Sequence, residues 1–258
     1  MSWWGKLLGG TFGFMIGGPI GALIGAALGH GLDRGAEQAG HGGGGFFSHQ
    51  ERAQTVFFTA TFSVMGHIAK ADGRVTPDEI RMASLVMDRL GLSPAHKHVA
   101  RQLFSQGKEP GFPLDEVVDQ LRRECHFSAN LLRVFLEIQV SAAYADGRVD
   151  PAERRILRHL CDALGFSAEE LESIERLVRS GGGARPEEID LDHAYAVMGV
   201  SADTSDTDLK RAYRRLMSRH HPDKLIARGL PEEMIKVATE KTKEIKAAYE
   251  RIKRERSG

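Results

Sequence analysis

The stretch Ala69-Lys-Ala-Asp-Gly-Arg-Val-Thr-Pro-Asp-Glu79 returns in similar form as Ala143-Tyr-Ala-Asp-Gly-Arg-Val-Asp-Pro-Ala-Glu153. Apolar side chains ahead of each copy follow helical spacing, and the proline and glutamate near its end are typical of a helical first turn. Gly73 and Gly147 suit the left-handed turn that ends a helix. Each copy therefore predicts helix, turn and helix. The repeat predicts an all-helical domain of about six or seven helices over residues 51–179.

The repeated Asp-Gly-Arg-Val-x-x-x-Glu also matches the second half of an EF-hand calcium loop. The positions of the first and third oxygen ligands hold Ile68 and Lys70 in one copy and Ala142 and Tyr144 in the other. Calcium needs six or more oxygen ligands, and each loop supplies too few. We therefore favour structural roles over metal binding. The carboxylates that remain as metal candidates are Asp72, Glu79, Asp146 and Glu153.

Paired helical halves that each carry Ala-Asp-Gly-x-Val-x-x-x-Glu resemble the TerB-like domain. This all-helical module is associated with tellurite resistance and with certain membrane-anchored bacterial proteins. The resemblance implies the fold of residues 51–179 and leaves the ligand of the domain open. The domain also contains the only two cysteines, Cys125 and Cys161, whose apolar neighbours predict small buried side chains.

The amino-terminal segment has no charged residue from Leu7 to Leu32. As a helix this run would be about 39 Å long, against about 30 Å for the hydrocarbon core of a bilayer. It is also longer than the apolar part of a cleaved signal peptide. The sequence thus predicts one transmembrane helix within residues 1–32. The glycine-rich residues 33–50 that follow predict a flexible linker.

Glycines recur at every fourth position of this apolar run. A row of small residues lets a second helix approach closely in lipid, so the pattern predicts self-association, with a homodimer as the expected state. The glycines of the predicted dimer face are Gly9, Gly13, Gly17, Gly21, Gly25 and Gly29.

A second linker over residues 180–190 leads into a C-terminal segment, 191–258. Here Ser205 begins a predicted helix whose buried stripe includes Leu209 and Ala212, and whose opposite side is basic. The loop His221-Pro-Asp-Lys224 follows, and then a long helix with Met234, Ala238 and Ile245 on its apolar side. The two helices predict an antiparallel hairpin with the loop exposed at its tip.

Four motifs of this segment resemble a J-domain closely: Ala194-Tyr-Ala-Val-Met-Gly-Val200, Lys210-Arg-Ala-Tyr-Arg-Arg-Leu216, His221-Pro-Asp223 and Lys243-Glu-Ile-Lys-Ala-Ala-Tyr249. The resemblance implies a non-catalytic protein that binds a DnaK-type chaperone and accelerates its ATP hydrolysis. Carried over by position, the docking face would comprise Lys210, Tyr213, Arg214 and Arg215, and the triggering loop would comprise His221, Pro222 and Asp223.

The order of membrane segment, TerB-like domain and terminal J-domain is similar to membrane-anchored DnaJ-like co-chaperones. Lys6 and Arg34 flank the apolar run and leave its orientation open. Because DnaK-type partners and ATP are cytosolic, the resemblance implies a single-pass protein of the bacterial inner membrane, with a periplasmic N-terminus and a cytoplasmic J-domain. It further suggests a restricted set of clients and a regulatory role in envelope stress.

The charge balance argues against nucleic acid as a partner. The chain has 35 basic and 35 acidic residues, and residues 190–258 hold 15 basic and 12 acidic ones. That excess is small, and no aromatic stacking platform accompanies the arginines. The chain shows no arrangement of a catalytic nucleophile with its base, so we expect neither an enzyme nor a cofactor. The alternative is a metal-responsive envelope stress sensor in which the TerB-like domain carries the primary function.

Overall fold

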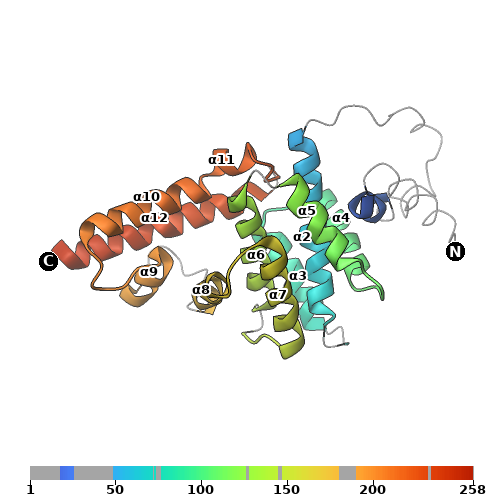
Figure 1. The fold of residues 1–258 in the computed structure, drawn as a ribbon, viewed down its shortest axis with the longest axis horizontal. Helices are drawn as coiled ribbons and strands as arrows, with labels where there is room; N and C mark the ends of the chain where they lie inside the picture. The colour runs from blue at the N-terminus through green and yellow to red at the C-terminus, as the bar shows by residue number, and fades with distance from the viewer. Residues whose placement is uncertain are drawn as a thin grey trace.

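The computed structural model describes residues 18–25, 49–71, 73, 77–125, 128–144, 147–179, 190–231 and 234–257. Within these ranges the regular structure is helical and contains no strand (Figure 1). The prediction of an all-helical protein is confirmed for this part of the chain.

Seven helices build the middle of the molecule, and α2 runs through their centre, packed against α4, α5, α6 and α7 (Figure 1). The central position of α2 follows from its composition, because Phe57, Phe62 and several smaller residues of this helix are fully buried. The helices are α2 (His49–Ala69), α3 (Pro77–Arg89), α4 (Pro94–Gly107), α5 (Leu114–Glu124), α6 (Ala129–Ala143), α7 (Pro151–Leu164) and α8 (Ala168–Arg179).

The helix ends form as the repeat predicts. Gly73 and Gly147 both have positive φ, at 84° and 86°. Asp150 and Glu153 close a capping box at the start of α7, since the Asp150 side chain accepts from the Ala152 amide and the Glu153 carboxylate accepts from the Asp150 amide. Ser167 caps α8 in the same way. Local sequence therefore determines where these helices begin and end.

The C-terminal segment forms α9 (Leu191–Met198), α10 (Asp206–His220), α11 (Pro222–Ile226) and α12 (Ile235–Ser257). Helices α10 and α12 make the predicted hairpin, which projects from the middle helices, and α9 packs on α12 (Figure 1). This hairpin has a small core of its own. Its buried residues are Ala194, Val197, Met198, Leu209, Ala212, Ile245, Ala248 and Ile252.

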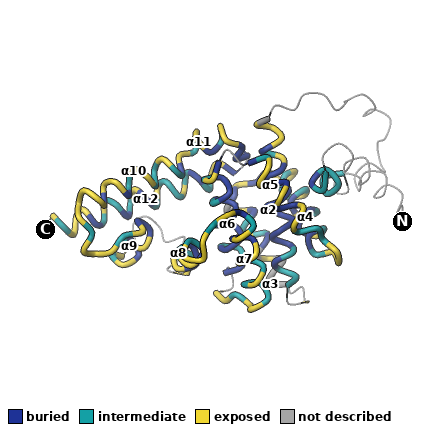
Figure 2. The backbone as a smooth tube through the Cα atoms, in the orientation of Figure 1, coloured by how far each residue is buried: buried dark blue, intermediate teal, exposed yellow. Residues whose placement is uncertain are grey.

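The tip of the hairpin differs from the prediction. Met234 and Ala238, expected on the apolar side facing α10, belong instead to the core of the middle helices, as do Leu225 and Leu230. Figure 2 shows the end of the hairpin near α11 lying close to the middle helices. Periodicity identifies an apolar face and does not say what covers it. The tip is therefore docked against the middle domain rather than free in solvent.

The amino-terminal description is limited to one helix over residues 18–25. Ile20 is buried, and its amide donates to Gln120 Oε1 of α5 at 3.0 Å. Within the described ranges, none of the helices has the length and hydropathy that a membrane crossing requires. Most of the predicted span from Leu7 to Leu32 lies outside the described residues, and of its described part Ile20, Leu23 and Ile24 pack on the core of the middle helices. Gly9, Gly13, Gly17 and Gly29 lie outside the described residues.

Candidate functional site

The loop His221-Pro-Asp223 lies at the junction of α10 and α11. Pro222 takes the first position of α11, where its fixed φ suits a helix and its missing N–H leaves no bond unmade. The His221 carbonyl accepts from the Leu225 amide at 3.1 Å, which closes the turn. The side chains of His221 and Asp223 are 47% and 88% exposed, and their Nδ1 and Oδ2 atoms are 4.0 Å apart. The loop therefore has a defined backbone and accessible side chains.

Helix α10 presents a basic face beside this loop. Lys210, Arg214 and Arg215 are exposed. Arg211 pairs with Asp208 at 3.1 Å, whereas no carboxylate of the described residues lies within ion-pairing distance of Lys210, Arg214 or Arg215. Unneutralised cations on a rigid helix are suited to an acidic partner. We refer to Lys210, Arg214 and Arg215 as the basic face.

Tyr213, the fourth residue expected on the docking face, is oriented toward the hairpin. Its ring stacks on Tyr249 of α12, with centroids 4.3 Å apart and planes at 19°. The ammonium group of Lys253 lies over the Tyr249 ring, 5.8 Å from its centroid. Tyr213 thus links α10 to α12 and is only partly accessible beside the basic face.

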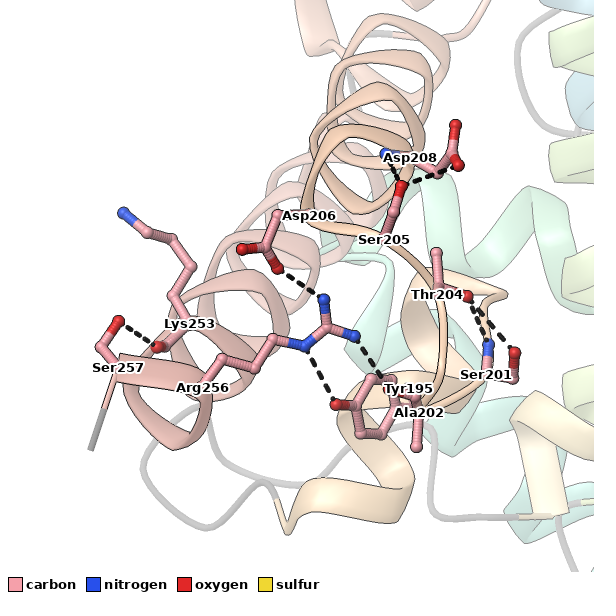
Figure 3. A network of polar contacts seen from close by, with 10 residues as sticks. All are labelled: Tyr195, Ser201, Ala202, Thr204, Ser205, Asp206, Asp208, Lys253, Arg256 and Ser257. Atoms are coloured by element: carbon pink, nitrogen blue, oxygen red, sulfur yellow. Dashed lines mark hydrogen bonds and ion pairs between the residues drawn. The ribbon is translucent and has the colours of Figure 1, made fainter.

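Arg256 ties together the end of the hairpin that is remote from the loop (Figure 3). Its guanidinium donates to Asp206 Oδ1 at 2.6 Å, to the Ala202 carbonyl at 3.1 Å and to the Tyr195 hydroxyl at 3.4 Å. The hydrogen bonds to Tyr195 and Asp206 raise the pKa of Arg256. One side chain of α12 therefore holds α9, the connecting loop and the start of α10, which sets the rotation of α10 and the direction of the basic face.

A cluster of charged groups lies beneath the loop, where α10 meets α6. His220 is 3% exposed, and burial lowers its pKa against the opposing effect of the Glu137 carboxylate. His220 is consequently neutral near pH 7, because the ordinary value of 6.5 is already below that pH. Burial alone would raise the pKa of Glu137, but His220 when protonated, Lys241 and Arg133 lower it. Glu137 is thus a carboxylate of the middle domain that faces groups from both helices of the hairpin.

Of the four metal candidates, only Glu153 has a described side chain. Glu153 is engaged in its capping box. Asp72 and Asp146, like the side chain of Glu79, lie outside the described residues. Among the residues that are described, no group of three or more His, Cys, Asp or Glu side chains is placed to share a metal ion.

Both cysteines are buried, as predicted. Burial, assisted by Glu124, raises the pKa of Cys125 to about 12. Burial also raises the pKa of Cys161. Since the thiolate is the reactive form, both side chains serve as small apolar groups.

Sequence reasoning missed the residues behind the loop that contact the middle domain. Leu225, Leu230 and Met234 are 1% exposed or less. The available signal was their position, because apolar side chains directly after an exposed polar loop need a cover. Residues of the middle domain that contact this segment include Gln50, Gln54 and Leu131, which lie far earlier in the chain, where no local pattern identifies them.

The fold and the loop define a J-domain protein with an additional helical domain, and comparison with known families agrees. Residues 193–257 match the DnaJ domain, and residues 58–176 match the family of tellurite resistance protein TerB. Residues 1–39 match the co-chaperone DjlA transmembrane domain, which indicates a membrane-anchored protein.

Similar proteins extend over the whole chain. The co-chaperone protein DjlA of Photorhabdus laumondii is 44% identical, with 99% of each chain covered. Those of Photobacterium profundum and Coxiella burnetii are each 43% identical; the alignments cover 98% and 100% of this chain and 99% of each relative. The chain belongs to the DjlA family of co-chaperones, and its J-domain implies a DnaK-type chaperone as partner. No solved structure matches it.

Proposed function

We propose that this protein recruits a cytosolic DnaK-type chaperone to the membrane and stimulates its ATP hydrolysis. The observation that carries the proposal is the accessible His221-Pro-Asp223 loop, held at a fixed place beside a basic face without carboxylate partners among the described residues. Such a regulator has to bind the chaperone and to trigger its ATP hydrolysis. The basic face offers charge for binding, and the rigid loop offers a contact for triggering. The TerB domain would restrict the clients, with a regulatory role in envelope stress.

The direct test is ATP hydrolysis by a DnaK-type chaperone with and without the full chain in nanodiscs. Stimulation above the basal rate is expected, and its absence would refute the proposal.

Reversing two charges of the basic face is expected to weaken docking. Arg214→Glu with Arg215→Glu would replace attraction to an acidic partner by repulsion, so the concentration for half-maximal stimulation should rise about tenfold or more and depend less on salt. Stimulation measured over a concentration series at two salt levels checks this.

The matched control changes net charge equally on the other helix of the hairpin. Lys246→Glu with Arg254→Glu alters exposed residues of α12 and should leave half-maximal stimulation within about twofold of the unaltered chain. Equal losses from both pairs would mean that overall charge, rather than the basic face, attracts the partner.

For the membrane segment, we propose a single-pass helix with a periplasmic N-terminus, a cytoplasmic J-domain and homodimerisation through the glycine row. The match of residues 1–39 to a transmembrane domain and the spacing of the glycines support this.

Leucine at Gly17 and Gly21 is expected to reduce self-association of the membrane segment strongly, because bulky side chains keep two helices apart. A membrane association reporter fused to residues 1–39 measures it. Ala22→Leu with Ala26→Leu, which places two leucines at the same spacing outside the glycine row, serves as the control. Unchanged association of the glycine variant would exclude this face.

A further inference from the structure

The segment after the triggering loop joins the J-domain to the middle domain. Its apolar residues Leu225, Leu230 and Met234 lie in the core of the middle helices, separate from the small core of the hairpin. The Gln50 and Gln54 side chains of α2 donate to the backbone carbonyls of Ile226 and Leu230, at 3.3 and 3.4 Å. We call residues 225–238, without the undescribed 232 and 233, the docking segment.

The docking segment comes very close to α2 and α6 at Gly229. This glycine has φ of 105°, and a Cβ built there would lie 2.7 Å from Ala53 Cβ on α2 and 3.5 Å from Leu131 Cδ2 on α6. A side chain on either surface would push the two apart. Ala53 and Gly229 together therefore allow the backbone of the docking segment to rest directly on α2.

The charged cluster around Glu137 lies near His220, on the other side of the loop from the docking segment. Arg133 of α6 pairs with Glu137 and with Glu170, each at 3.2 Å. Glu137 in turn faces His220, the residue that immediately precedes the loop, and burial lowers the pKa of Arg219 beside it. His220, directly before His221-Pro-Asp223, is thus buried near this cluster, and the middle domain holds the docking segment that follows the loop.

The contact leaves the loop itself open. His221 remains about half exposed and Asp223 almost fully exposed, while His220 and Leu225 on either side are buried. Both ends of the loop are fixed while its side chains stay accessible. The loop is therefore already ordered before a partner binds. A partner then does not have to order it on binding.

We infer that the middle domain is a positioning element for the J-domain, which holds the His221-Pro-Asp223 loop ready for a DnaK-type chaperone through the docking segment. The inference rests on the proposed function and extends it, because it makes chaperone stimulation depend on residues outside the J-domain. Ala53 and Glu137 are positioning residues in this scheme.

The test replaces Ala53 with arginine in the full chain, in nanodiscs, and leaves every J-domain residue intact. The large arginine side chain should separate the docking segment from α2. Amide hydrogen exchange in residues 225–230 and 234–238 should then become at least tenfold faster, and half-maximal stimulation should require about tenfold more chain, while the maximal rate changes less. Ordering one further residue on binding is enough for such a change.

Thr55→Arg is the matched control, because Thr55 is exposed on the same helix two residues away. It should leave both exchange and stimulation unchanged. Glu137→Gln, which keeps the shape and removes the charge, should give an intermediate loss.

Faster exchange in Ala53→Arg with unaltered stimulation would overturn the inference. A gain in stimulation would also overturn it, because the middle domain would then inhibit the J-domain. Unaltered exchange would refute docking itself. If even the unaltered chain fails to stimulate, the proposed function fails, and the exchange data still report on docking independently.

Discussion

The chain with His221→Gln is expected to lose its stimulation of chaperone ATP hydrolysis almost completely. His221 contributes little to folding, because its side chain is about half exposed and makes no cap hydrogen bond to α11, and glutamine keeps similar size and polarity. The free energy of unfolding should therefore change by no more than about 0.5 kcal/mol. Steady-state ATP hydrolysis over a range of chain concentrations measures the loss.

The control is the same substitution at a distant exposed position, His98→Gln on α4. It should stimulate like the unaltered chain. Retention of full stimulation by the His221 variant would remove the loop from the mechanism, and the basic face alone would then have to account for it.

Gly66→Ala is expected to destabilise the middle domain strongly. Helices α2 and α4 touch through their backbones at Gly66 and Gly107. A Cβ at Gly66 would lie 2.0 Å from the Phe104 carbonyl oxygen, and one at Gly107 would lie 1.8 Å from the Ser63 carbonyl oxygen. Because backbone cannot turn aside as a flexible side chain can, α4 must shift as a whole.

Overpacking of this kind destabilises by about 3 kcal/mol, which corresponds to roughly 6 to 12 °C in the unfolding midpoint of a domain this size. Thermal unfolding followed by circular dichroism checks it. Ser105→Ala, at an exposed position of α4, should shift the midpoint by about 2 °C or less. A Gly66 variant as stable as this control would show that the two helices can separate without loss.

The helix ends could be predicted from the sequence because their causes are local. Asp150 and Glu153 cap the helix that the repeat predicts, and Ser93 and Ser167 cap α4 and α8 through contacts that are equally local. The loop at His221 was recognisable for the same reason, since proline and its neighbours determine its backbone within a few residues.

The surroundings of the loop could not be predicted. Met234 and Ala238 were assigned to the hairpin from their spacing, and that assignment was correct about burial and wrong about the partner. Tyr213 was predicted on the docking face, and only the structure identifies Tyr249 as the ring on which it stacks. In each case the residue pattern shows that a side chain is covered, and the covering residue lies far away along the chain.

The helical class, the helix boundaries and the exposed loop follow from the order of the residues alone, because they depend on interactions within one or two turns. That Gly66 faces Gly107 across two helices, and that Ala53 meets Gly229 behind the loop, follows only from how the helices pack. Such contacts depend on backbone surfaces fitting together once distant segments have folded. Small residues that permit close approach have no side chain to indicate it in advance.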